Sequence, residues 1–294
     1  MSNYNDYNED SIVIIEDDIE KIKQARGMYI GTTKFDCVMH LFKEVLQNSI
    51  DESNNKNSGC DKIEVFVDCI NKKIRISDNG RGIPLGVVEK ICTVIQSSGK
   101  FNKDDKKSAY GKGTSGLNGV GLTAVNALSN YFIIKSYRED KVKICKFEFG
   151  HIVKTEMKDA IGHETGTIVE FNPNEELIGR CSYDHKQFLE LCETMSYLSD
   201  LKIKCEVVSS KGKEIKEKYH SKNGIIDLLN KLVDSPIVKP IYLCSESDEI
   251  SIEVAFTYAT EEDCKLLKEN NNTYIESFVN FCTTKEGENI ARIL

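Results

Sequence analysis

Several common signatures are missing from this chain of 294 residues. It has no P-loop pattern G-x-x-x-x-G-K-[ST], which excludes the most common way of holding nucleotide phosphates. No apolar run approaches the roughly 18 residues that cross a membrane, and no charged-then-apolar signal segment opens the chain. We therefore expect neither a P-loop nucleotide-binding protein nor a membrane protein.

Disulfide and metal-site patterns are also lacking, although the chain has 11 cysteines. The cysteines are scattered, with no C-x-x-C pair and no His/Cys spacing typical of a metal site. The chain is far longer than the small secreted domains that depend on disulfides. We expect reduced thiols, mostly in the core, and a cytoplasmic protein.

An excess of positive charge is absent, since 47 acidic residues outnumber 39 basic ones and the net charge is −8. Binding to nucleic acid needs a basic surface that neutralises phosphate charge, so this chain is not expected to provide the main nucleic-acid-binding surface. A partner chain that supplies such a surface is not excluded. A hydrophobic content of 40% and a charged content of 29% are typical of a globular protein with a substantial core.

Hydrophobic periodicity predicts an α+β chain in three parts. Residues 1–15 are expected to form a flexible arm, 16–220 one large domain and 221–294 the truncated start of a second domain. Helices are predicted from about 16 to 26, from 36 to at least 51, and at 85 to 96, 119 to 129, 184 to 198 and 225 to 232. Strands are predicted at 63–68, 73–78, within 131–172, at 202–218, 237–243 and 250–259, and a mobile loop at 97–118.

The first candidate site stretch lies on the helix predicted from residue 36. Glu44, Asn48 and Asp51 are spaced i, i+4, i+7 and share one face, apart from the apolar arc. Alone, such a stripe is typical of a solvated polar face. Beside a nucleotide, Asn48 can give an oxygen to Mg²⁺, and Glu44 can deprotonate a water that attacks the γ-phosphate.

The second stretch is Asp78-Asn-Gly-Arg-Gly-Ile-Pro84, at the end of a predicted strand. Two glycines in three residues permit unusual backbone geometry and let a ligand approach closely. A buried carboxylate at Asp78 can accept a hydrogen bond from the exocyclic amine of adenine, which selects adenine over guanine. The same residues also suit a tight turn with a structural aspartate.

The third stretch is Gly113-Thr-Ser-Gly-Leu-Asn-Gly-Val-Gly121, which precedes an apolar helix. Glycine-rich backbone leading into a helix presents free N–H groups to phosphate oxygens. Lys100, on the preceding loop, can also reach phosphates, whereas the lysines around it suit a solvated surface. Each stretch is a weak signal alone, but the three together in this order indicate an ATP site.

This arrangement resembles the GHKL (Bergerat) nucleotide-binding fold shared by gyrases, heat-shock chaperones, histidine kinases and mismatch-repair ATPases. The resemblance is closest to the ATPase subunit of type II DNA topoisomerases, of the gyrase B or topoisomerase IV B type. It implies a two-layer α/β sandwich followed by the start of a transducer-like α/β domain. The narrower match is carried by Arg26-Gly-Met-Tyr-Ile-Gly31, Ser98-Gly-Lys-Phe101, Val120-Gly-Leu-Thr-Ala-Val-Asn-Ala-Leu-Ser129, Thr165-Gly-Thr167 and Ser277-Phe-Val-Asn280.

The resemblance implies a role for each site residue. Glu44 would be the general base and Asn48 the magnesium ligand. Asp78 would bind the adenine amine, supported by Gly82 and Thr165 through hydrogen bonds or water.

Further residues would enclose the nucleotide. Arg81 would cover the base while paired with Glu52, and Tyr110 would touch the ribose or adenine from a lid. The other residues placed at the nucleotide are Asp51, Ile83, Pro84, Lys100, Gly116, Leu117, Asn118, Gly119, Val120 and Gly121.

The resemblance also implies the working assembly. ATP with Mg²⁺ would close the lid and join two such domains into a homodimer that forms the entry gate for a DNA segment. The arm around Tyr7 to Val13 would reach the other subunit. DNA would be engaged through the full enzyme, together with a partner topoisomerase subunit that carries the cleavage tyrosine.

Some positions depart from the family pattern. Arg26 stands where bacterial gyrases usually have proline, Asn118 where they have histidine, and Ser115 where a glycine is customary. The family's catalytic lysine should come from a loop beyond Leu294, and its metal-binding domain is also missing. We therefore expect an ATP-binding fragment or one piece of a split subunit, whose hydrolysis is slow or absent in isolation.

Two other functions fit the same residues. One is another ATPase of this fold, with a mismatch-repair or chaperone role. The other is a nucleotide-dependent dimerisation module that does not hydrolyse ATP.

Overall fold

The computed structural model describes residues 15–30, 37–55, 57–97, 119–247, 251–260, 262, 274–279 and 281–283. The arm predicted at 1–15, except Ile15, and the loop predicted at 97–118, except Ser97, lie outside these residues. So do five residues that the sequence places at the nucleotide: Lys100, Tyr110, Gly116, Leu117 and Asn118.

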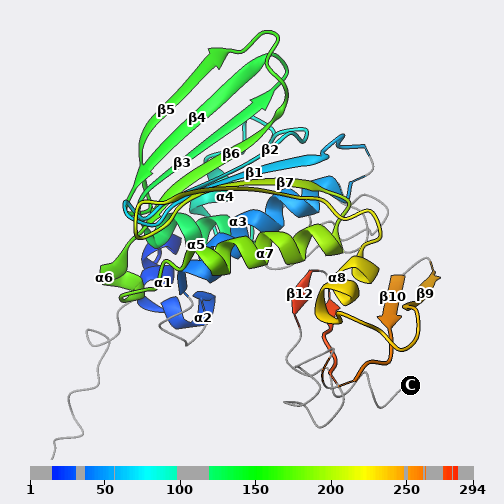
Figure 1. Ribbon diagram of the computed structural model, residues 1–294. Coiled ribbons are helices and arrows are strands. Elements are labelled where there is room, and N and C mark those ends of the chain that lie inside the picture. The colour runs from blue at the N-terminus through cyan, green and yellow to red at the C-terminus, as the bar shows by residue number, and fades with distance from the viewer. Residues whose placement is uncertain are drawn as a thin grey trace, which may run out of the picture.

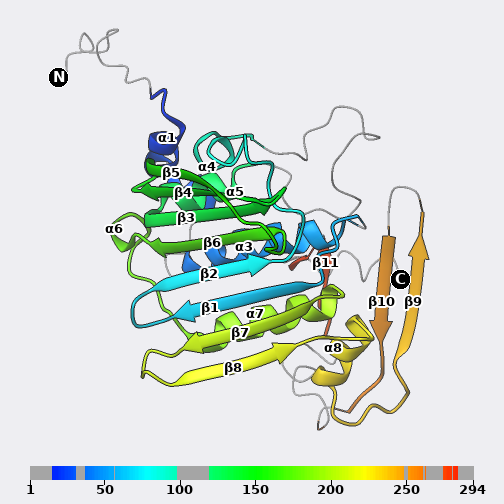
Figure 2. The same ribbon diagram turned by 90° about the horizontal axis from the view of Figure 1, so that it is seen from above.

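A mixed sheet of eight strands forms one layer, in the order β5-β4-β3-β6-β2-β1-β7-β8 (Figure 2). Neighbouring strands are antiparallel except β1 and β7, which run parallel. The strands are β1 (Lys62–Asp68), β2 (Lys73–Asp78), β3 (Ser129–Arg138), β4 (Lys141–Glu148), β5 (His151–Asp159), β6 (Gly166–Pro173), β7 (Lys202–Val208) and β8 (Glu214–Tyr219).

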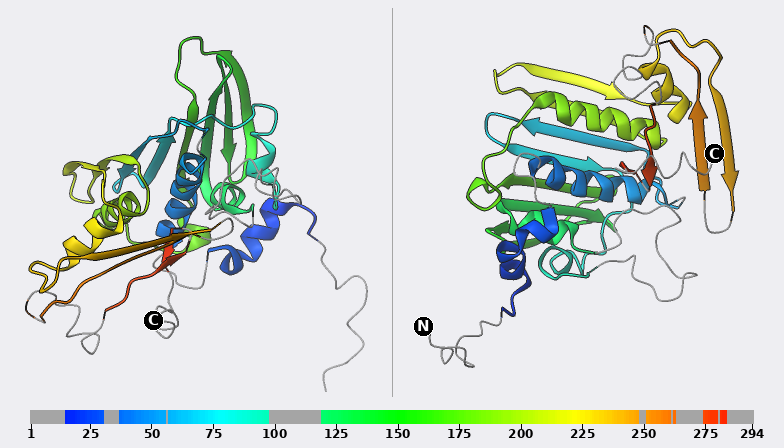
Figure 3. Two further views of the ribbon diagram at one scale, coloured as in Figure 1. Left: turned by 90° about the vertical axis from the view of Figure 1, so that its right-hand side faces the viewer. Right: turned by 90° about the horizontal axis from the view of Figure 1, so that it is seen from below.

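Helices form the second layer, on one face of this sheet (Figures 1 and 3). Helix α3 contacts β2 and β6, α5 contacts β3 and β6, and α7 contacts β7 and β8. The helices are α1 (Asp18–Gln24), α2 (Arg26–Ile30), α3 (Cys37–Ser53), α4 (Lys90–Thr93), α5 (Gly121–Ala127), α6 (Glu175–Ile178) and α7 (His185–Leu198). The predicted two-layer α/β sandwich is confirmed.

Side-chain alternation explains why the helices cover only one face. On β1, the side chains of Ile63, Val65 and Val67 are buried, while the residues between them are more exposed. The apolar arc predicted on α3 is buried as expected, and its Phe42 packs edge-to-face on Phe188 of α7, with ring centroids 5.0 Å apart. One continuous core therefore lies between the two layers.

A smaller set of elements follows the large sheet. Helix α8 (Ile225–Leu232) contacts α7 and also β10 (Ser251–Phe256), which pairs with β9 (Ile241–Glu246). A further short pair joins β11 (Phe278–Val279) to β12 (Cys282–Thr283). The separate sheets are compatible with a second domain, but the boundary near residue 221 stays a prediction.

The helix predicted over residues 85–96 is wrong in extent. Only α4 is helical there, and residues 85–89 form turns. The backbone hydrogen bonds mix two spacings, since the N–H of Cys92 bonds to the carbonyl of Glu89 while that of Val94 bonds to Lys90. Gly86, two residues after Pro84, lowers the helix propensity at the expected start.

Asn126 on α5 joins three segments of the core. Its side chain is fully buried, and Nδ2 donates to the carbonyls of Cys92, at 2.8 Å, and Gly150, at 2.9 Å. Removing this amide leaves two buried carbonyl groups without their donor, each of which costs roughly 1–3 kcal/mol.

We expect Asn126→Ala to lower the free energy of unfolding by roughly 2–4 kcal/mol, because it loses both bonds and leaves a cavity. Urea denaturation with a far-UV signal measures this change. Asn71→Ala, whose side chain is exposed, is the control and should change stability by less than about 1 kcal/mol. Equal effects of the two variants would contradict the assigned role.

Candidate functional site

Helix α3 presents Glu44 and Asn48 on successive turns. Asn48 Nδ2 donates to the backbone carbonyl of Glu44, at 2.9 Å, which fixes the amide and directs its oxygen, Oδ1, the other way. Both residues are partly exposed, whereas Asp51, one turn further, is 1% exposed. The predicted stripe thus presents one carboxylate and one amide oxygen to solvent, and its third member is buried.

His40 is a neighbour of Glu44 that the sequence analysis did not assign to the site. Its Nε2 lies 3.0 Å from the carbonyl oxygen of Tyr29 and 3.5 Å from Glu44 Oε1. The spacing i, i+4 on one helix was the available signal. His40 therefore restricts where the Glu44 carboxylate can point.

Gly121, at the start of α5, brings the third sequence stretch to this carboxylate. A Cβ atom added at Gly121 would collide with Glu44 Oε2, and it would lie 3.5 Å from the carboxyl carbon. Gly119 has φ +59°, a conformation that favours glycine, and Val120 follows as the N-cap residue of α5. The structure thus brings residues 119–121 beside Glu44.

Asp78, the last residue of β2, faces α3. Its carboxylate accepts hydrogen bonds from Ser49 Oγ at 3.0 Å and from the backbone N–H groups of Gly80 at 3.0 Å and Thr167 at 3.3 Å. Ser49 comes from the arc of α3 that packs on the sheet, and Thr167 is the register partner of Asp78 on β6. Three elements therefore hold this carboxylate in place.

Desolvation raises the pKa of Asp78 to about 6. The three hydrogen bonds to the carboxylate lower this pKa and so offset part of the rise, while the nearby Glu52 carboxylate raises it further. A carboxyl group with a raised pKa binds its proton more tightly in the folded chain than in the unfolded one. Its contribution to stability is therefore fully present below the unfolded value and is lost as the pH rises through about 6. Above that pH, Asp78 is a carboxylate that can only accept hydrogen bonds.

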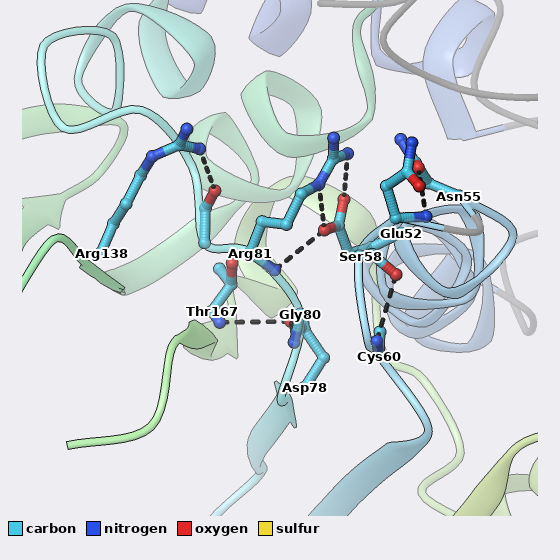
Figure 4. A network of polar contacts seen from close by, with 11 residues as sticks. Glu52, Asn55, Ser58, Cys60, Asp78, Gly80, Arg81, Arg138 and Thr167 are labelled. Atoms are coloured by element: carbon cyan, nitrogen blue, oxygen red, sulfur yellow. Dashed lines mark hydrogen bonds and ion pairs between the residues drawn. The ribbon is translucent and has the colours of Figure 1, made fainter. Parts of the chain in front are cut away.

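Arg81 and Glu52 form a two-pronged ion pair, as predicted (Figure 4). The Nε and Nη2 atoms of Arg81 donate to the two oxygens of Glu52 at 2.8 and 2.9 Å, and the Arg81 backbone N–H donates to Oε1 at 2.9 Å. A Cβ atom at Gly80 would collide with Glu52 Cγ, so glycine is required for this approach. Whether Arg81 covers a base stays a prediction.

The rest of the second stretch is fixed against β3. Gly82 has φ +70°, and a Cβ there would collide with the carbonyl oxygen of Tyr137. The carbonyl of Gly82 accepts a bond from Arg138, at 3.2 Å, and the carbonyl of Ile83 accepts one from Ser136 Oγ, at 2.7 Å. Gly82 and Ile83 are thus held by the backbone and side chains of β3, while Pro84 is exposed.

The support that the resemblance assigns to Thr165, through hydrogen bonds or water, stays a prediction, and a neighbouring residue makes the direct hydrogen bond to Asp78. Thr167 makes it, because β6 begins at Gly166 and its register sets Thr167 opposite Asp78. Thr165 is exposed and lines a cavity of about 150 Å³ together with Asp78 and the stacked rings of Tyr137 and His163. The cavity is also lined by Lys62, Glu64, Asn79, Ser77, Glu164, Gly166 and Ile168, which includes residues of the outer sheet face.

No cluster of three or more His, Cys, Asp or Glu able to hold a metal occurs in the part of the chain that the structure describes. The side-chain oxygen of Asn48 is instead a single, oriented oxygen ligand. A divalent cation at this position would need further oxygens from a ligand such as a nucleotide phosphate, as Mg²⁺ commonly does. None of the helices among the described residues is long and apolar enough to cross a membrane.

Family comparison agrees with this geometry. Residues 34–174 match the model of the histidine kinase-, DNA gyrase B-, and HSP90-like ATPases. The chain belongs to this ATPase family. The matched stretch contains α3, the turn after β2 and the start of α5. The chain is therefore an ATP-binding module.

Similarity to individual relatives narrows the branch. The chain is 32% identical over 302 residues to the B subunit of DNA topoisomerase 4 from Staphylococcus epidermidis and 33% identical over 304 residues to its counterpart from Staphylococcus aureus. Each alignment includes 98% of this chain but 42% of the relative. The chain thus spans less than half the length of these topoisomerase subunits, whose ATPase type it shares.

Solved structures give the same fold. The 43K ATPase domain of Thermus thermophilus gyrase B, in complex with an aminocoumarin, has a TM-score of 0.65 and 27% identity, covering 82% of this chain and 62% of that one. The topoisomerase IV ATP-binding domain of Francisella tularensis has a TM-score of 0.68 and 24% identity, covering 91% and 68%.

Burial of Asp78 generates a prediction about pH. Between about pH 4 and pH 6, the folded chain holds a proton at Asp78 that the unfolded chain has released, so ionisation destabilises the fold as the pH rises. We expect Asp78→Asn to remove this decline, which urea denaturation across that pH range measures for both proteins.

Asp61→Asn is the matched control for this experiment. The pKa of Asp61 is lowered by its hydrogen bond to Lys202, so Asp61 contributes stability above the unfolded pKa that is lost as the pH falls. Its effect has the opposite sign. A stability difference between wild type and Asp78→Asn that does not depend on pH would contradict the buried-carboxylate assignment.

Proposed function

We propose that this chain binds ATP with Mg²⁺ at the junction of α3, β2 and α5, and that it is the ATP-operated module of a type II DNA topoisomerase. The observation that carries the proposal is the Asp78 carboxylate, held by Ser49, Gly80 and Thr167 where α3 faces the sheet. Glu44, Asn48 and Gly121 lie on the same side of the sheet, on α3 and α5.

Asp78 recognises the purine in this proposal. Above pH 6 its carboxylate only accepts hydrogen bonds, which suits the exocyclic amine of adenine and rejects the carbonyl that guanine has at the same position. Thr167 and Gly80 fix the carboxylate, while Glu52 fixes Arg81 at the mouth of the same turn. Gly82, Ile83, Pro84 and Thr165 form the rim.

Glu44 and Asn48 act at the triphosphate in this proposal. The Asn48 oxygen holds the magnesium ion, which when bound neutralises phosphate charge. Glu44 accepts the proton of the attacking water, and His40 limits its orientation. The backbone N–H groups of residues 119–121 hold the phosphates in this proposal. Lys100, Leu117 and Asn118, assigned to the phosphates as well, lie outside the described residues, as do Gly116 and Tyr110, of which Tyr110 is assigned to the ribose or adenine.

Nucleotide binding joins two copies of this chain in the proposal, as the gate of a topoisomerase would require. The relatives' names support a topoisomerase rather than a chaperone or mismatch-repair role, because the similarity extends over 98% of the chain, beyond the shared ATPase region. DNA and a second topoisomerase subunit would be the partners of the complete enzyme. Since these relatives are bacterial, we place the protein in the cytoplasm.

A titration with a non-hydrolysable ATP analogue and Mg²⁺ tests the nucleotide site and the dimer together. We expect saturable binding by calorimetry and a shift from monomer to dimer by size-exclusion chromatography. Asp78→Asn should weaken binding markedly, because the amide presents a donor where the adenine amine needs an acceptor. Unchanged affinity in this variant would remove Asp78 from the adenine pocket.

Glu44→Ala separates binding from chemistry. We expect nucleotide affinity to remain and any hydrolysis to fall on the order of 10²–10⁴-fold, because a positioned general base is lost. A phosphate-release assay measures the rate, and the variant Glu148→Ala, changed at an exposed position of β4, is the control. Loss of nucleotide binding in a folded Glu44→Ala protein would contradict the base assignment.

A further inference from the structure

The β7–β8 hairpin concentrates positive charge at one edge of the sheet of an acidic protein. Residues 201–222 contain seven lysines and three glutamates, although the whole chain carries −8. Among the described residues, β8 is the last strand of the sheet, so no described strand lies beyond the hairpin. Five of these lysines, which we name the basic edge, are exposed: Lys211, Lys213, Lys216, Lys218 and Lys222.

The lysines of the basic edge carry charge that the described part of the chain does not neutralise. None of the five forms an ion pair with a described residue, whereas Lys202 and Lys204 of β7 pair with Asp61 at 2.8 Å and Glu206 at 3.1 Å. Two carboxylates, Glu214 and Glu217, lie on β8 itself, and Lys216 contributes to lowering the pKa of Glu206. The edge therefore keeps an excess of positive charge.

Strand register brings like charges together on this hairpin. Lys204 and Lys218 are direct cross-strand partners, an unfavourable pairing of like charges, and the ion pair of Lys204 with Glu206 compensates only part of this positive charge. Beside them, Lys216 lies opposite Glu206. The positive charge of Arg75 on β2, which lies across β1 from β7, also lowers the pKa of Glu206. Alternation directs Lys216 and Lys218 to the outer face, away from the helices and from the nucleotide site.

Spacing along the edge suits a polyanion with closely repeated charges. The six residues of β8 extend over roughly 17 Å, a length over which duplex DNA presents about ten phosphate charges. Lys211 and Lys213 flank Gly212 in the hairpin turn at one end, and Lys222 follows β8 at the other. Lysines therefore line the whole edge rather than one point on it.

We propose that the basic edge is an auxiliary docking surface for the phosphate backbone of duplex DNA. This inference rests on the proposed function, because it gives the topoisomerase module a contact with its substrate that lies outside the nucleotide site. Lysines on an edge strand also prevent edge-to-edge aggregation, and that alternative makes a different prediction. Contacts of this kind read charge and not base sequence.

A salt titration of DNA binding tests the proposal on the chain itself. Fluorescence anisotropy with a labelled 40-base-pair duplex should show binding at low salt that is independent of base sequence. In Lys213→Gln/Lys216→Gln/Lys218→Gln, the slope of log K against log salt should become shallower by roughly 2–3, and affinity should fall about tenfold or more.

Lys135→Gln/Lys141→Gln/Lys146→Gln is the matched control, with the same loss of charge from lysines on β3 and β4 of the same sheet. We expect it to retain most of the DNA affinity. Absence of DNA binding by the unaltered chain, or equal losses in both triple variants, would overturn the proposal. So would lower solubility without a change in DNA affinity, or patch-dependent binding of polyglutamate without binding of DNA.

Nucleotide titration of the same variants keeps the two proposals apart. None of the substituted lysines belongs to the ATP site, so both triple variants should bind the ATP analogue as the unaltered chain does. Failure of DNA binding with normal ATP binding would overturn the proposal for the basic edge and leave the proposed ATP site intact. Failure of ATP binding in the unaltered chain would instead remove the proposed function.

Discussion

Burial of the Asp78 carboxylate is the constraint on which the site depends. A carboxylate in this position loses hydration, and the structure compensates with three hydrogen bonds from α3, β6 and the turn that follows β2. Those bonds are possible only while Ser49 faces the sheet and Thr167 keeps its register. The chemistry of the site and the packing of the two layers are therefore one arrangement.

Close backbone approaches surround that carboxylate and explain the glycines. Gly80 lets Glu52 reach Arg81, Gly82 lies against β3, and Gly166 passes so close to the carbonyl of Asp78 that a Cβ would collide with it. A larger residue at any of these positions would collide with α3, with β3 or with the turn itself. The turn is thus held from both sides before any ligand arrives.

Sequence reasoning predicted the layers well because each depends on local periodicity. The apolar arc of α3, the β1–β2 hairpin, α7 and α8 were all expected within a few residues of their observed bounds. The helix expected at 85–96 is wrong in extent. Apolar residues there are spaced as in a helix, but residues 85–89, which include Gly86, form turns instead. Periodicity cannot reveal such an interruption.

Sequence reasoning identified the site residues that belong to the family's motifs, but it missed partners whose contacts depend on strand register or on helix orientation. The ion pair of Glu52 and Arg81 was anticipated, since family resemblance named both partners. Thr167, Ser49 and His40 were missed because their roles depend on strand register and on which side of a helix faces the sheet. A sequence shows two threonines around Gly166, and only the three-dimensional pairing selects between them.

The single parallel pairing in the sheet determines where this module can be divided. The family match ends at residue 174, yet β1, which precedes the Asp78 turn, has β7 of residues 202–208 as its neighbour. A piece ending at 174 would expose the full length of β1 as an open edge and would uncover the core beneath α7. A unit that retains the site and keeps β1 paired therefore extends at least through β7, past the residue where the family match ends.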